Sequence, residues 1–228
     1  MNVFTSYKKT ESLDKLKERM QSFDLLCINY NTFKSKFSRT FQKIYTDGGD
    51  WSHVGIIIKN NVLHDNNIIF KDKIYIWHSS VRSNGVQLYE LDEYIKLKHL
   101  NIVKIGWCKL LNNPLNRKVN DTNEIYNKRI EQIKKNITKF YTKTSTSTFN
   151  FTMMKLVFPF LKNNNNDKKI PIKYKNSYFC SEYITMIYKI INVIDNSVDP
   201  ESVLPELLIT YTNDDGDKIF DEPILLKF

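Results

Sequence analysis

The sequence has few of the residues that cross-link a chain or interrupt its regular structure. Its 228 residues include three cysteines, six glycines and six prolines. An odd number of widely separated cysteines argues against a disulfide framework and favours a reducing compartment. The sequence contains no CxxC pair, so a structural zinc site is not expected.

Long apolar runs are also lacking. The segment Met1–Met20 is charged and has no apolar core, so we do not expect a signal peptide. The longest apolar stretch, Phe149–Leu161, is too short to span a bilayer and contains Pro159. These absences predict a cytoplasmic protein.

Positive charge is in excess, with 34 Lys and Arg residues against 25 Asp and Glu, a net charge of +9. Such a balance favours phosphate-bearing partners or an anionic membrane surface. The lysines are scattered, and no module of basic and aromatic residues stands out, so nucleic-acid binding is not expected. An anionic membrane surface stays open as a partner.

The pattern of apolar residues predicts an α+β fold in a single domain over residues 1–228, with one mainly antiparallel sheet packed by helices. Polar and charged residues dominate about 111–148, where we predict a helical insertion. Helices are predicted over Glu11–Gln21, Lys34–Tyr45, Leu91–Leu97, part of Leu111–Tyr141 and part of Asn176–Val193. Strands are predicted over Asp24–Asn29, Ser52–Lys59, Lys73–Ser79, Gly85–Tyr89, Asn101–Lys109 and Ile224–Leu226.

Cys180 is the first candidate functional residue. Ser177 is suited to cap the helix that follows, which would place Cys180 in the first turn. The positive end of the helix and its free N–H groups favour a thiolate there, and the thiolate is the nucleophilic form. The backbone N–H of Cys180 could also stabilise an oxyanion. The alternative is an inert cysteine that packs at a helix start.

His53 is the second candidate, because a thiol nucleophile needs a base within hydrogen-bond reach. On a strand, His53, Gly55 and Ile57 share one face. Gly55 would leave space for a neighbouring helix or a substrate beside the histidine. The alternative is a structural histidine at a strand edge.

A third group is needed to orient the imidazole of His53. His78 lies on the next good strand, and His64 is closer in sequence. Either residue alone is more often an ordinary polar residue. His99 follows a lysine-rich helix and is expected to face solvent.

Four segments in order resemble the circularly permuted branch of the NlpC/P60 papain-like superfamily, which includes YiiX-like hydrolases, lecithin:retinol acyltransferase-like proteins and a poxvirus relative. In that branch a histidine on a strand comes early and a cysteine at a helix start comes late. The matching segments are Phe23–Cys27, Ser52–Ile56, Gly85–Tyr94 and Phe179–Glu182.

The resemblance implies a permuted papain-like fold with Cys180 as nucleophile, His53 as general base and His78 as the third polar residue. His64 remains an alternative, because its distance from His53 is close to the histidine spacing in the acyltransferase group. The long segment Asn60–Lys73 and the polar region Asn112–Thr148 depart from the pattern. Each could be a lid, a partner surface or filler.

The implied function is a thiol hydrolase or acyltransferase that acts on a peptide, amide or lipid-ester carbonyl through a thioester, with no metal or organic cofactor. The resemblance and the Asn, Lys and Ile bias suggest a large DNA virus, which would place the protein in the host cytoplasm or the virion. Two rivals are a catalytically silent viral structural protein and a lipid-binding module that uses the apolar patch Phe149–Phe160. The oligomeric state is not indicated.

Overall fold

The protein is known from a computed structural model that describes residues 9–32, 36, 39–40, 50–59, 62–63, 73–80, 85–149 and 176–227. Three features singled out in the sequence lie largely or wholly outside these ranges. They are the helix predicted over Lys34–Tyr45, the alternative site residue His64 and the apolar patch Phe149–Phe160.

A mixed seven-stranded sheet forms the centre of the α+β fold, in the order β1-β9-β6-β2-β3-β4-β5. All neighbouring strands are antiparallel except β1 and β9, which are parallel. A separate parallel pair joins β7 and β8. The strands are β1 (Thr10–Ser12), β2 (Leu25–Tyr30), β3 (His53–Ile58), β4 (Tyr75–Ser80), β5 (Gly85–Glu90), β6 (Ile102–Cys108), β7 (Thr148–Phe149), β8 (Ser177–Tyr178) and β9 (Ile224–Lys227).

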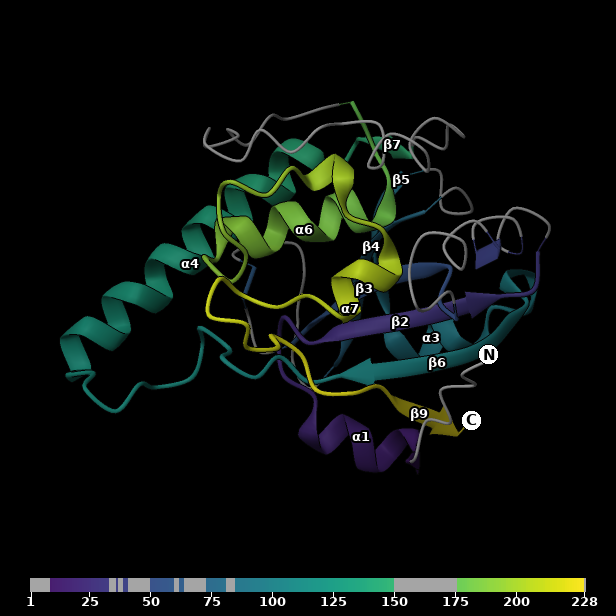
Figure 1. The fold of residues 1–228 in the computed structure, drawn as a ribbon, viewed down its shortest axis with the longest axis horizontal. Helices are drawn as coiled ribbons and strands as arrows, with labels where there is room; N and C mark the ends of the chain where they lie inside the picture. The colour runs from purple at the N-terminus through teal and green to yellow at the C-terminus, as the bar shows by residue number, and fades with distance from the viewer. Residues whose placement is uncertain are drawn as a thin grey trace.

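Helices cover both faces of the sheet (Figure 1). One face packs against α4, α6 and α7, and the other packs against α1 and α3. The N-terminal end of α4 extends beyond the other elements (Figure 1). The helices are α1 (Leu13–Arg19), α3 (Leu91–Lys96), α4 (Asn123–Thr144), α6 (Cys180–Ile190) and α7 (Pro205–Ile209), with 3-10 turns η1 (Lys98–Leu100) and η2 (Pro200–Ser202).

The two faces of the sheet explain the near-continuous apolar composition of its central strands. Every residue of β2 and β3 is buried. Side chains alternate between the faces, so Val54 packs in the core with α6, while Ile57 packs in the core with α1 and α3. The structure confirms the strand predicted over Ser52–Lys59 and places it inside the sheet.

Asp24 fixes the start of β2 to the end of β6. Its carboxylate accepts hydrogen bonds from the Trp107 indole at 2.9 Å and from the backbone N–H groups of Leu110 at 3.0 Å and Gln21 at 2.8 Å. Burial raises the pKa of Asp24, and these three bonds oppose that shift. Asp24, in the first of the four segments that carry the family resemblance, therefore has a structural role.

Two local predictions were wrong. The segment predicted as a helix over Glu11–Gln21 begins as the edge strand β1, which pairs with β9 far along the chain. Ser177 does not cap α6, because it lies in β8 and the helix begins at Cys180. Both errors come from pairings between distant segments, which override local preference. Within the described ranges, no helix is long and apolar enough to cross a membrane.

Candidate active site

The pairing between β3 and β4 stops halfway along both strands. It joins Ile56 to Trp77, Ile57 to Ile76 and Ile58 to Tyr75, and goes no further. By contrast, β4 pairs with β5 over all six of its residues. Residues 53–55 of β3 and 78–80 of β4 form the unpaired end of this ladder, and the predicted site residues His53 and His78 lie on it.

The structure brings His53 and His78 together. His53 Nε2 lies 2.8 Å from His78 Nδ1, a hydrogen-bond distance, and the ring centroids are 5.0 Å apart. His53 is 4% exposed and His78 is 1% exposed. His78 is therefore the histidine beside His53 in the described structure, whereas His64 lies outside the described ranges.

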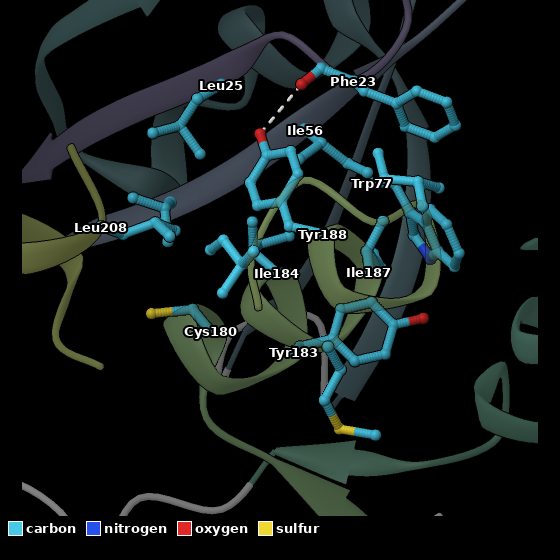
Figure 2. Packing of buried hydrophobic residues seen from close by; sticks show 14 of the residues in the cluster. Phe23, Leu25, Ile56, Trp77, Cys180, Tyr183, Ile184, Ile187, Tyr188 and Leu208 are labelled. Atoms are coloured by element: carbon cyan, nitrogen blue, oxygen red, sulfur yellow. Dashed lines mark hydrogen bonds between the residues drawn. The ribbon is translucent and has the colours of Figure 1, made fainter. Parts of the chain in front are cut away.

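Cys180 is the first residue of α6, at the helix start that the sequence predicted. The Glu182 carboxylate caps this helix by accepting from the backbone N–H of Phe179 at 3.1 Å. The Ser79 hydroxyl donates to the Tyr178 carbonyl at 3.0 Å, which ties the unpaired end of β4 to the residues just before Cys180. Figure 2 shows the sulfur of Cys180 pointing away from the ring of Tyr183.

The sulfur of Cys180 interacts with the unpaired end of β3. Burial raises the pKa of this thiol to about 12, while the backbone N–H groups of Val54, Ser181 and Cys180 itself act to lower the pKa. Val54 directly follows His53, and its N–H belongs to the part of β3 that makes no pair with β4. Because the β3–β4 ladder ends before Val54, the backbone N–H of Val54 is available to the Cys180 sulfur.

The histidines and Cys180 come from opposite faces of the sheet. Because side chains alternate along a strand, His53 lies on the same face as Ile57, and His78 lies on the same face as Ile76. This is the face that packs against α1 and α3, whereas Cys180 packs in the core on the α6 face. An electrostatic effect links the two sides, because Cys180 contributes to raising the pKa of Tyr94, behind burial and Tyr30. The sulfur is therefore within electrostatic range of Tyr94, whereas the pKa shifts of His53 and His78 have no contribution from Cys180.

Both imidazoles are neutral at neutral pH in this environment. Burial lowers the pKa of His53 well below its usual 6.5, and His78 lowers it further. Burial also lowers the pKa of His78, to about 3. Because the Cys180 thiol and both imidazoles are neutral, no thiolate–imidazolium pair exists in the resting arrangement.

Two tyrosines that the sequence analysis missed enclose the histidine pair. Tyr30 packs on His53 with ring centroids 5.4 Å apart, and Tyr94 packs edge-on against His78 at 5.1 Å. The hydroxyls of Tyr30 and Tyr94 are hydrogen-bonded to each other. These four side chains form a closed ring, which we call the His–Tyr ring. Tyr30 lies on the same strand face as Leu26 and Ile28, which the sequence pattern indicates. Its position beside His53 depends on the order of the strands in the sheet, which the pattern does not indicate.

The prediction that Gly55 leaves room for a helix or a substrate was wrong. A Cβ atom at Gly55 would lie 2.8 Å from Ile76 Cγ1 and 3.2 Å from His78 Cβ. The neighbouring strand β4 occupies the space. Gly55 is needed because it allows β4, and with it His78, to lie close against β3.

Within the part of the chain that the structure describes, neither a cluster of metal ligands nor the cavity that borders α4 forms part of this arrangement. Among the described residues, no group of three or more His, Cys, Asp and Glu side chains could hold a metal ion. A cavity of about 820 Å³ lies at the other end of α6, between α4 and the loops that contain Asn113 and Asn213. Cys180 is 1% exposed, so a carbonyl reaches its sulfur only after neighbouring atoms move.

Comparisons with known proteins give distant likeness to solved structures. No protein-family profile matches the chain, and no curated protein matches it. Among solved structures, the chain is similar to one described as the metalloprotein yiiX from Escherichia coli O157:H7, DUF1105, with 15% sequence identity and a TM-score of 0.41. The match covers 75% of this chain and 65% of that chain. A likeness this distant assigns no activity.

Proposed function

We propose that the protein is a cysteine-dependent hydrolase or acyltransferase with a circularly permuted papain-like fold. Cys180 is the nucleophile, His53 the general base and His78 the group that orients it. One arrangement carries the proposal: the backbone N–H of Val54 interacts with the Cys180 sulfur, while the preceding residue, His53, is hydrogen-bonded to His78. Three segments far apart in sequence supply these groups.

The hydrogen bond between the histidines determines which nitrogen of His53 is available. Its Nε2 is engaged with His78, so Nδ1 is the atom that can take a proton from the thiol. This role requires that His53 carries its proton on Nε2 and donates it to His78 Nδ1. His78 then carries its own proton on Nε2, a buried atom with no hydrogen-bond partner among the described residues.

The reaction follows from these roles. As the Cys180 sulfur attacks the carbonyl carbon, its proton passes to His53, and an S–C bond forms while the carbonyl oxygen becomes an oxyanion. The imidazolium of His53 then protonates the leaving amine or alcohol, and a thioester remains. Water or another acceptor gives up a proton to His53 and bonds to the acyl carbon. The S–C bond then breaks, the acyl group leaves on the acceptor, and the proton on His53 returns to the sulfur as the thiol. The N–H groups around the sulfur are placed to stabilise the oxyanion.

Charge separation occurs only during the reaction, because the thiol and both imidazoles are neutral at rest. The polar groups around the sulfur then have to stabilise the developing charges. The substrate is an amide or ester carbonyl on a peptide or lipid.

The proposal is tested by trapping the thioester. Incubation with a p-nitrophenyl ester should add one acyl group to Cys180, located by mass spectrometry of the digested protein. Iodoacetamide near neutral pH should label Cys180 faster than Cys27 or Cys108, because His53 takes the proton of Cys180 as the sulfur reacts. Equal labelling of the three thiols, with turnover intact in Cys180→Ala, would refute the proposal. That result would favour a binding or structural protein that retains the fold.

A further inference from the structure

Helix α4 carries much of the positive charge of the protein and is only partly packed. It contains six Lys and Arg residues and two Glu residues, a net charge of +4 within a total of +9. Its buried residues are Ile133, Ile137, Phe140 and Thr144, all from the middle of the helix onward. The N-terminal half projects from the body (Figure 1). The candidate active site uses none of these residues.

The lysines of α4 form a stripe along the helix. Lys128, Lys135 and Lys139 are all exposed. At 3.6 residues per turn they lie within an arc of about 40° around the helix axis, and Ile125 lies about 40° beyond the edge of that arc. Within the described ranges these three lysines make no ion pair, whereas Lys134 pairs with Glu131 at 3.5 Å. The stripe therefore presents unneutralised charge.

The projecting end of α4 exposes aliphatic side chains in a well-ordered tip. Val119 is 102% exposed and Ile125 is 53% exposed. Arg129 pairs with Asp121 at 2.6 Å and also donates to the Asn116 carbonyl at 2.9 Å, which fixes the loop before the helix. The bonds of Arg129 thus fix the loop at the end of the lysine stripe, where Val119 and Ile125 are exposed to solvent.

The arginines and the aromatic ring of this region are engaged within the protein. Arg117 and Arg129 lie over the ring of Tyr126, at 5.5 Å and 5.6 Å from its centroid. Proteins that bind single-stranded nucleic acid present aromatic rings on which bases stack. Among the described residues, the large hydrophobic side chains that are exposed are all aliphatic. Flexible lysines beside exposed aliphatic residues suit a surface of diffuse negative charge with an apolar interior.

We propose that α4 docks the protein on an anionic lipid bilayer, with Lys128, Lys135 and Lys139 facing the headgroups and Val119 and Ile125 inserted between them. Lysines near an anionic membrane each add attraction that decays within a Debye length. Binding therefore needs anionic lipid and weakens as salt is added. The proposal does not depend on the chemistry of Cys180.

The test is co-sedimentation with vesicles of phosphatidylcholine, alone or with about one third phosphatidylserine. The wild type should bind the mixed vesicles and not the neutral ones. Lys128→Glu/Lys135→Glu/Lys139→Glu should lower the affinity about 100-fold or more. The matched control, Lys15→Glu/Lys98→Glu/Lys227→Glu, changes the net charge equally at exposed positions on α1, η1 and β9, and should lower it much less. Circular dichroism verifies that each variant is folded.

The aliphatic tip is tested separately with Val119→Ser/Ile125→Ser. This variant should bind mixed vesicles several-fold more weakly than the wild type does, because serine side chains do not insert favourably between the headgroups. Three results would overturn the proposal. They are equal binding to neutral and mixed vesicles, equal losses in the two triple variants, and binding to duplex DNA that is tighter than binding to mixed vesicles.

Discussion

The β2–β6 ladder and the unpaired end of the β3–β4 ladder each hold buried thiols, in different surroundings. In the β2–β6 ladder, Cys27 and Cys108 face each other with sulfurs 3.5 Å apart. Burial raises the pKa of Cys27 well above its usual value, and the neighbouring thiol raises it further. At the unpaired end, burial also raises the pKa of Cys180, but three backbone N–H groups oppose the shift.

The two sites differ in the backbone N–H groups available to the sulfur. A complete ladder uses its N–H groups between strands, so a thiol beside it meets only side chains. Where pairing stops, as it does beyond Ile56, an N–H group becomes available to a sulfur. Burial alone therefore does not distinguish a structural thiol from a candidate nucleophile, whereas the donors around the sulfur do. Four measurements can break or sharpen this comparison.

The largest expected effect is on acylation. His53→Ala should slow acylation of Cys180 about 10²- to 10⁴-fold, because it removes the base that takes the thiol proton. The rate is measured from the burst of p-nitrophenolate with an activated ester. Cys27→Ala provides the matched control and should leave the burst unchanged. A burst that survives in His53→Ala would show that the sulfur reacts without this base.

The next effect is on the packing of the two strands. Gly55→Ala should lower the free energy of unfolding by up to about 3 kcal/mol, because the new Cβ would meet Ile76 Cγ1 at 2.8 Å. Pushing β4 outward should also lengthen the bond between His53 and His78 and slow acylation. Urea unfolding and the ester burst measure the two effects. Unchanged values for both would mean that the strands do not need this close approach.

The third effect is on stability at acidic pH. The folded state holds the pKa of His78 at about 3, while the unfolded chain has its usual 6.5, so the unfolded state binds more protons between these values. Stability is full above about pH 6.5 and falls as the pH drops towards 3. His78 alone should cost about 2 kcal/mol at pH 5 relative to pH 7.

Urea titrations at the two pH values measure this loss, and His78→Gln should remove the His78 part of it. Burial holds the pKa of the Cys27 thiol well above this range, so Cys27→Ala should retain the full pH dependence. Equal pH dependence in the wild type and His78→Gln would contradict the burial of a neutral imidazole.

The smallest effect concerns the His–Tyr ring. Tyr94→Phe removes the bond between the hydroxyls of Tyr30 and Tyr94 and should cost about 1 kcal/mol in stability. The ring contact with His78 is retained, so acylation should change less than in His53→Ala. Urea unfolding measures the cost. A loss of acylation as large as in His53→Ala would mean that the hydroxyl pair acts on the reacting groups directly.

The sequence predicted the six longest strands but missed β1, β7 and β8, because local periodicity is readable only in the longer elements. The strand of His53 and the helix of Cys180 each begin at that residue in the structure. The sequence did not predict Tyr30 and Tyr94 as neighbours of the histidines, because that neighbourhood depends on the order of strands in the sheet. Nor could it predict the donor role of Val54, which arises only where a ladder stops.

The bond from Ser79 to the Tyr178 carbonyl joins residues 99 positions apart, and it has a consequence for the order of synthesis. Both histidines and both tyrosines of the His–Tyr ring leave the ribosome long before Cys180 does. A nascent chain can thus assemble its imidazole pair first and receive the sulfur only after α6 has been synthesised. Any thiol chemistry at this site would be withheld from partly made chains.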